Sequence, residues 1–298
     1  MRRDAVVLIS LTSLVMVAFA SNSVLNRLAV EGMFIDPGSF ALIRVVSGAI
    51  ALGMILIVRG GGLPVQLRPR LLGSLSLSLY LVGFSLAYLT LDAGLGALIL
   101  FGTVQLSMFA HAARRDGGLS RRRTIGAAIA FVGLIFALWP GGGSPTDPVG
   151  ALLMVAAGIG WAIYSIAGRK ESDALGATAA NFMIATPLLA VLFLNGGTEV
   201  TFAGAGLSIA CGAVTSGLGY ALWYTVLPRL ETSTAAVVQL SVPVIAILGG
   251  AVFLGEALSI RIGLSAVIVL GGIAIAIISL AAPKGHKVAH VRDQTPED

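Results

Sequence analysis

Fourteen carboxylates occur in this chain, and each stands at the end of an apolar run, between two runs or in a terminal segment. Proton-driven membrane carriers commonly keep a titratable acid in the middle of a span, where an unpaired charge costs ~3 kcal/mol on insertion scales. No acid occupies such a position here. The pattern predicts a facilitative carrier, or one coupled by a route without a buried carboxylate.

Motifs for catalysis or metal binding are nearly absent. No HExxH sequence, paired acid or Cys/His cluster occurs, and His111 is the only histidine outside the C-terminal segment. His111 stands near one end of an apolar run, where anchoring at the interface explains it better than catalysis. We therefore expect that the protein is not an enzyme and binds no cofactor or metal. An enzyme embedded in the membrane and a non-transporting scaffold remain alternatives.

Polar and aromatic side chains in the middle of apolar runs could bind a substrate. Tyr and Trp at that depth have no interface to reach, so their OH and NH groups need a partner in protein, water or ligand. Several share a helical face through i, i+3, i+4 spacing. Core packing explains any one of them singly, but the set indicates a polar cavity. The candidate substrate-binding residues are Phe19, Asn22, Tyr80, Phe84, Trp161, Tyr164, Ser165, Tyr220 and Gln239.

Two further residues are candidates for gating or structural roles. Arg44 is the one permanent charge inside an apolar run. It could snorkel to the headgroups or cap a neighbouring helix, or it could pair with a substrate carboxylate. Pro243, four residues after Gln239, removes a backbone donor and should bend its helix, either as a mobile hinge or as a passive kink. Asn26 is expected to bond a neighbouring helix.

The elements that position these residues are read from the composition. Of 298 residues, 57% are hydrophobic and 11% charged, and the mean hydropathy is +0.96, so lipid must be the solvent. Apolar runs of about 20 residues predict transmembrane helices. LSLSLY at 75–80 has the period of a strand but lies within such a run, and we expect helix. The ten predicted spans are 5–27, 38–58, 70–90, 93–113, 123–139, 148–168, 177–194, 204–227, 233–254 and 260–282.

Charge placement predicts the orientation. If each span crosses once and the N-terminus is cytoplasmic, nearly all basic residues fall on the cytoplasmic side, Arg27 and Arg261 being the two that border the outer side. Both termini are then cytoplasmic. The net positive charge of the chain is explained by this topology, and we expect no nucleic acid as a partner. A secretory signal ending at Ala18-Phe19-Ala20 is the competing interpretation of the first run.

The chain contains an internal repeat. Phe19 and Arg27 match Trp161 and Arg169, each 142 positions on, and Asp92 matches Glu231 at an offset of 139. We therefore expect an all-α polytopic membrane protein with two inverted five-helix repeats, 1–140 and 141–283. A polar cytoplasmic tail at 284–298, expected to be disordered, follows them. Inverted repeats around a midplane site are typical of secondary transporters that work by alternating access.

Three stretches carry a family resemblance: FASNSVLNR at 19–27, FALIR ending at Arg44, and VVQLSVPVIAILGGAVFLGEALS at 237–259. Together they resemble the drug/metabolite transporter (DMT) superfamily, EamA type, a ten-helix exporter, and among its members most of all the YddG-type amino-acid exporters. Val104 stands where the second repeat has Pro243, so the fourth helix should be straighter than the ninth.

The resemblance implies export of amino acids or small metabolites, and the neutral, aromatic candidate residues favour aromatic and bulky neutral amino acids. The expected protein is a multi-pass transporter of a bacterial inner membrane, with a small-molecule substrate and membrane lipid as partners, monomeric or weakly homo-oligomeric. A proton-coupled efflux carrier for cationic drugs is the alternative, disfavoured by the lack of buried acids.

Overall fold

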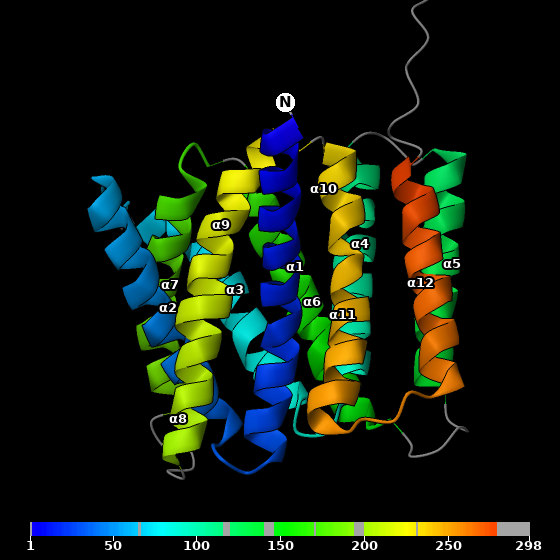
Figure 1. Ribbon diagram of the computed structural model, residues 1–298, viewed down its shortest axis with the longest axis horizontal. Helices are drawn as coiled ribbons and strands as arrows, with labels where there is room; N and C mark the ends of the chain where they lie inside the picture. The colour runs from blue at the N-terminus through cyan, green and yellow to red at the C-terminus, as the bar shows by residue number, and fades with distance from the viewer. Residues whose placement is uncertain are drawn as a thin grey trace, which may run out of the picture.

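The structure is a computed structural model, and it describes residues 2–64, 67–115, 120–139, 146–169, 171–193, 200–230 and 232–278. Most of the linker between the predicted halves and the predicted tail lie outside these ranges. The described chain is helical, with one isolated bridge between Ile35 and Val200. Figure 1 shows the helices standing roughly side by side along one common direction.

The first half contains five unbroken helices. Each overlaps a predicted span, and the stretch 75–80 is helical as expected. The helices are α1 (Arg2–Glu31), α2 (Pro37–Arg59), α3 (Leu67–Ala87), α4 (Ala93–Arg115) and α5 (Arg121–Leu138).

The second half begins with two similar helices and then contains interrupted ones. The eighth predicted span is built from α8, the π-helical η1 and α9, followed by the 3₁₀ turn η2, and the ninth from α10, α11 and the π-helical η3. The bounds are α6 (Pro148–Gly168), α7 (Ala174–Phe193), α8 (Phe202–Ile209), η1 (Ala210–Leu218), α9 (Gly219–Val226), η2 (Leu227–Arg229), α10 (Thr232–Gln239), α11 (Ser241–Gly249), η3 (Gly250–Leu254) and α12 (Ile260–Ile278).

Nine helices of the described chain are long and apolar enough to cross a membrane. α5 is not among them because three arginines, Arg121 to Arg123, open it. α12 ends on the same face of the bundle at which α1 begins (Figure 1). We call this face the N-face, and the other the opposite face.

Local capping residues explain several helix boundaries. The Asp36 carboxylate accepts the backbone N–H of Ser39 at 2.9 Å, and Pro37 opens α2 behind it. Asp147 caps α6 in the same way, through the N–H of Gly150 at 2.9 Å. Gly60 ends α2 with φ +70°, a left-handed conformation that glycine adopts without a steric penalty.

The ninth predicted helix is interrupted just before Pro243, while its predicted bend stays a prediction. α10 ends at Gln239 and α11 begins at Ser241, with Pro243 in its first turn. Backbone N–H groups in the first turn of a helix have no partner within the helix, so a proline there loses no hydrogen bond. α4 runs without interruption through Val104. The fourth helix is thus continuous where the ninth is interrupted.

Helix contacts follow the pattern that an inverted duplication would produce. α1 packs on η1, α9 and α11, while α6, its counterpart in the second half, packs on α3 and α4. The second helices of the two halves, α2 and α7, pair with each other, and so do the fifth helices, α5 and α12. A cavity at the centre is therefore walled by helices of both halves.

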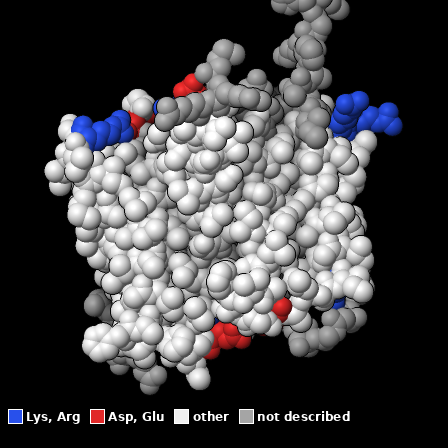
Figure 2. All heavy atoms as spheres, viewed as in Figure 1, with Lys and Arg blue, Asp and Glu red and all other residues white. Residues whose placement is uncertain are grey.

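Charged side chains gather at the two faces, and uncharged atoms cover the sides between them (Figure 2). The arginines that end α2 and α4 and begin α5 lie at the N-face. Five carboxylates of the described chain lie at the opposite face: Glu31, Asp36, Asp92, Asp147 and Glu256. The uncharged surface between the two faces is the one expected of a protein solvated by lipid.

Candidate functional site

A small cavity lies at the centre of the bundle, between the two halves. Helical spacing brings Phe19 and Asn22 of α1 to it on one face, and other residues reach it from α3, α4, α6 and α9. Its walls are formed by Phe19, Asn22, Ser23, Tyr80, Phe84, Leu100, Phe101, Trp161 and Tyr220. The free space, about 20 Å³, holds roughly one water molecule. This space is too small for an amino acid or a similar metabolite.

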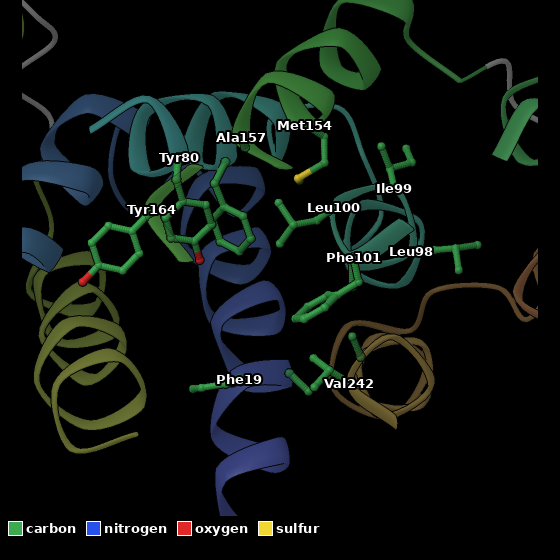
Figure 3. Packing of buried hydrophobic residues seen from close by; sticks show 14 of the residues in the cluster. Phe19, Tyr80, Leu98, Ile99, Leu100, Phe101, Met154, Ala157, Tyr164 and Val242 are labelled. Atoms are coloured by element: carbon green, nitrogen blue, oxygen red, sulfur yellow. The ribbon is translucent and has the colours of Figure 1, made fainter. Parts of the chain in front are cut away.

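Aromatic rings surround this cavity in a continuous series. The Tyr80 and Trp161 ring centroids lie 4.9 Å apart, and those of Trp161 and Tyr220 lie 5.3 Å apart. Phe19 meets Tyr220 edge-on at 5.7 Å, and Phe84 lies 5.2 Å from Tyr80. Figure 3 shows Phe101 reaching from α4 toward α1. Such rings offer flat apolar surfaces for an aromatic or aliphatic side chain.

Arg44 lies directly behind this wall and is fully buried. Its Nη2 donates to the Tyr80 hydroxyl at 3.0 Å and to Asn22 Oδ1 at 3.2 Å, and its Nε donates to Ser216 Oγ at 3.2 Å. The guanidinium also lies 5.0 Å from the Phe84 ring centroid, within range of a cation–π interaction. Arg44 therefore does not snorkel to the headgroups.

The positive charge of Arg44 has no anionic partner in the described part of the chain. None of the ion pairs found there includes Arg44, and its Nη1 lacks a hydrogen-bond partner. Burying a charge without a counterion costs several kcal/mol. Neutral acceptors and rings offset part of that cost, and an anion arriving at the cavity would offset more.

Asn22 joins Arg44 to the π-helical segment η1. Its Oδ1 accepts hydrogen bonds from Thr215 Oγ1 at 2.7 Å, Ser216 Oγ at 3.2 Å and Cys211 Sγ at 3.2 Å. A π-helical stretch displaces side chains from the regular helical register, and such stretches are frequent at functional sites. The Asn22 side-chain amide, which would be costly to bury in lipid without partners, is thus fully hydrogen-bonded within the protein.

Three predicted site residues do not line the cavity. The Tyr164 hydroxyl turns away from Tyr80 (Figure 3) and donates to Thr178 Oγ1 at 2.8 Å. Ser165 donates to the carbonyl of Trp161 within its own helix, at 2.7 Å. Gln239 is half-buried and donates to the carbonyl of Ala235 at 3.2 Å.

The other six predicted residues meet at the cavity, together with residues that were not among the candidates. Ser23 is one of them, and its i, i+4 spacing from Phe19 puts it on the same helical face. Phe101 is an aromatic residue in the middle of α4, and that position could have identified it as a candidate. Leu100 is an ordinary apolar residue, and nothing in the sequence distinguishes it. Thr215 and Ser216 contact Asn22 from the π-helical η1.

Asn26 confirms its predicted role, since its Nδ2 donates to Ser85 Oγ of α3 at 3.1 Å. No group of three or more metal-binding side chains occurs in the described ranges. The site is therefore described by rings, neutral hydrogen-bonding groups and one buried cation.

A second polar cluster ties helices together at the opposite face. Arg27 donates to the carbonyl of Tyr88 at 2.9 Å and lies 3.7 Å from Asp92. The Glu256 carboxylate accepts the backbone N–H of Ala93 at 2.6 Å, at the start of α4. Burial raises the pKa of Glu256, and the nearby Asp92 carboxylate raises it further. These bonds hold α1, α3, α4 and the end of η3 together.

The fold and this site together define a class: a multi-pass membrane transporter with a central cavity between two sets of helices. The EamA-like transporter family model matches residues 148–278. An uncharacterized protein of Pseudomonas aeruginosa is 43% identical over 268 residues, which is 89% of this chain and 92% of that protein. The chain belongs to the EamA-like transporter family, as its sequence motifs suggested.

More distant relatives carry functional names. A probable amino-acid metabolite efflux pump of Salmonella typhimurium is 27% identical over 67% of this chain and 72% of its own length. A protein of the same name from Escherichia coli is 26% identical over 66% and 72%. A solved crystal structure with 17% identity covers 90% of this chain and 96% of its own, with a TM-score of 0.64, and shares the fold.

Proposed function

We propose that this protein exports amino acids, aromatic and bulky neutral ones preferred, or related small metabolites, by alternating access. The observation that carries the proposal is the buried charge of Arg44, which has no anionic partner among the described residues and lies behind a cavity walled by aromatic rings. A substrate carboxylate would supply the missing negative charge. The rings would receive an apolar side chain, and neutral oxygens would accept from an ammonium group.

The same charge argues against the alternative substrate class. A cationic drug would meet a buried guanidinium of the same sign, and like charges in a medium of low dielectric constant repel strongly. The names of the Salmonella and Escherichia relatives agree with an amino-acid or metabolite substrate.

The proposed orientation in the membrane is supported by the charges at the two faces. Arginines concentrate at the N-face and carboxylates at the opposite face, so the N-face is assigned to the cytoplasm and both chain ends with it. The membrane is then a bacterial inner membrane, and the carrier works as a monomer or weak homo-oligomer. Transport is facilitative, because the cavity wall contains no carboxylate.

Counterflow in proteoliposomes tests the proposal. Purified protein is reconstituted with unlabelled phenylalanine inside, and uptake of labelled phenylalanine, tryptophan, leucine, glutamate and lysine is measured against protein-free liposomes. We expect accumulation of the first three without a pH gradient. A strict need for the gradient would remove the facilitative mechanism alone, and failure of every amino acid would overturn the substrate class.

A further inference from the structure

A groove opens between α2, α7 and α9 at the N-face ends of these helices. Its volume is about 660 Å³, far larger than the free space of the central cavity. Its walls are formed by Ile55, Arg59, Leu175, Leu218, Ala221, Leu222, Tyr224 and Thr225. They are mainly apolar, with the half-exposed Arg59 at the mouth and two hydroxyl-bearing residues on α9.

A short series of hydrogen bonds leads from a residue that lines this groove toward the central cavity. Tyr164 on α6 donates to Thr178 on α7 at 2.8 Å, and Thr178 donates to the Tyr224 hydroxyl on α9 at 3.2 Å. Tyr224 lines the groove. At the other end of the series, the Tyr164 ring lies 5.4 Å from Trp161, which lines the cavity.

These hydrogen bonds therefore lie between the groove and the cavity. They join three helices of the second half, α6, α7 and α9. Thr178 is 2% exposed and Tyr164 4% exposed, so water does not compete for their bond in this state. Each such bond contributes a net ~1 kcal/mol, which is weak enough to break during a conformational change and strong enough to bias the closed state.

We propose that the groove is the cytoplasmic vestibule of the transport path and that Tyr164, Thr178 and Tyr224 form its inner gate. The occupant of the vestibule is the transported substrate, a molecule with an apolar side chain and a carboxylate. The apolar walls receive the side chain, and Arg59 at the mouth attracts the carboxylate. Arg59 lies 3.4 Å from Asp173 in a half-exposed pair, a contact that water weakens and that a carboxylate can replace.

This inference rests on the proposed function, because it takes the N-face as cytoplasmic and the substrate as a carboxylate. The cluster at the opposite face supplies the second closure that alternating access requires. There, Glu256 and Arg27 hold α4, α3 and α1 together. Both ends of the cavity are thus closed by identifiable bonds.

Cysteine accessibility tests the gate without assuming a substrate. The wild-type chain, whose only cysteine is the buried Cys211, measures background labelling. Leu222→Cys reports the vestibule and Ser23→Cys reports the cavity, each with a negatively charged, membrane-impermeant thiol reagent applied at the N-face. We expect rapid labelling of Leu222→Cys and slow labelling of Ser23→Cys.

Thr178→Val removes both gate bonds with little change in volume. Added to Ser23→Cys, it should increase the rate of labelling roughly 30-fold, equivalent to ~1 kcal/mol for each of the two bonds. Thr186→Val is the matched control, because Thr186 lies on the same helix but donates to the carbonyl of Phe182 in α7 itself. That change should leave the rate within twofold. Tyr224→Phe, which removes one bond only, provides a milder gate variant if Thr178→Val lowers expression.

Three outcomes separate the possibilities. An unchanged Ser23→Cys rate in both gate variants would overturn the gate even if amino acids are transported. Labelling of Leu222→Cys by a lipid-soluble reagent alone would show that lipid fills the groove, and would overturn the vestibule. Gating as expected with no protection of Leu222→Cys by phenylalanine would retain the path and overturn the proposed substrate class.

Discussion

Arg44 on α2 and Asn22 on α1 are joined by a hydrogen bond of 3.2 Å, in which a buried guanidinium donates to a neutral amide oxygen. The neighbouring partners of Arg44, Tyr80 and Ser216, are neutral as well. The bundle therefore holds a permanent positive charge with acceptors but no counterion from the described chain. The predictions below follow from that arrangement and from the helices that maintain it.

Asn22→Asp should abolish most transport while leaving the protein folded. The new carboxylate would lie within reach of Arg44 and form a charge-assisted bond, which is stronger than the present neutral one. It would neutralise the site and repel a substrate carboxylate. We expect amino-acid counterflow to fall at least ~10-fold and the melting temperature to stay equal or rise. Full transport in Asn22→Asp would contradict a role for the Arg44 charge.

Tyr80→Phe should also weaken transport, because the variant takes an acceptor from the buried guanidinium. An unpaired buried donor costs ~1–3 kcal/mol, so we expect counterflow to fall at least ~5-fold. Tyr88→Phe, eight residues further along the chain, is the matched control, since the Tyr88 hydroxyl donates to the carbonyl of Ala93 at 3.4 Å. Equal losses in the two variants would show that packing, and not the bond to Arg44, matters at Tyr80.

Gly212→Ala should destabilise the protein by separating η1 from α2. A Cβ at this position would collide with the Arg44 carbonyl oxygen, which belongs to the backbone and cannot rotate away. We expect a loss of ~1–3 kcal/mol, as for overpacked cores, measured by thermal unfolding in detergent. Gly206→Ala, on the neighbouring α8, has open space around its Cβ position and should be neutral or stabilising by up to ~1 kcal/mol.

Glu256 should make stability depend on acidic pH. Because its pKa is raised in the folded protein, the folded state binds more protons than the unfolded state at pH values between the ordinary 4.5 and the raised pKa. The free energy of unfolding therefore falls as pH rises through that interval. Glu256→Gln should remove this slope from a series of melting temperatures measured at different pH. An identical slope in the variant would assign the effect to another group.

Much of the architecture was predictable because lipid imposes simple rules on a sequence. Each apolar run had to be a helix, since lipid offers no partner for an unpaired backbone group. Pro243 indicated the interruption of the ninth helix through the donor it lacks. The offset between Phe19 and Trp161 related the two halves, and both residues line the cavity.

The rest depended on contacts that a sequence does not display. Arg44 is long enough to reach an interface, so its burial could not be told from snorkelling. Thr215 and Ser216 reach Asn22 from the π-helical η1, although the Thr215 hydroxyl also lies 2.8 Å from the carbonyl of Cys211 in its own segment. Tyr164 shares a helix face with Trp161, yet its hydroxyl finds Thr178 instead of the cavity.

The central claim is that the Arg44 charge selects a substrate carboxylate at an aromatic cavity. The most direct test compares phenylalanine with phenethylamine, which has the same ring and ammonium group but no carboxylate, in counterflow with wild-type protein and with Arg44→Met. We predict that the wild type transports phenylalanine at least ~10-fold faster than phenethylamine, and that Arg44→Met loses this preference. Equal transport of the two compounds by the wild type, or an undiminished preference in Arg44→Met, would contradict the account.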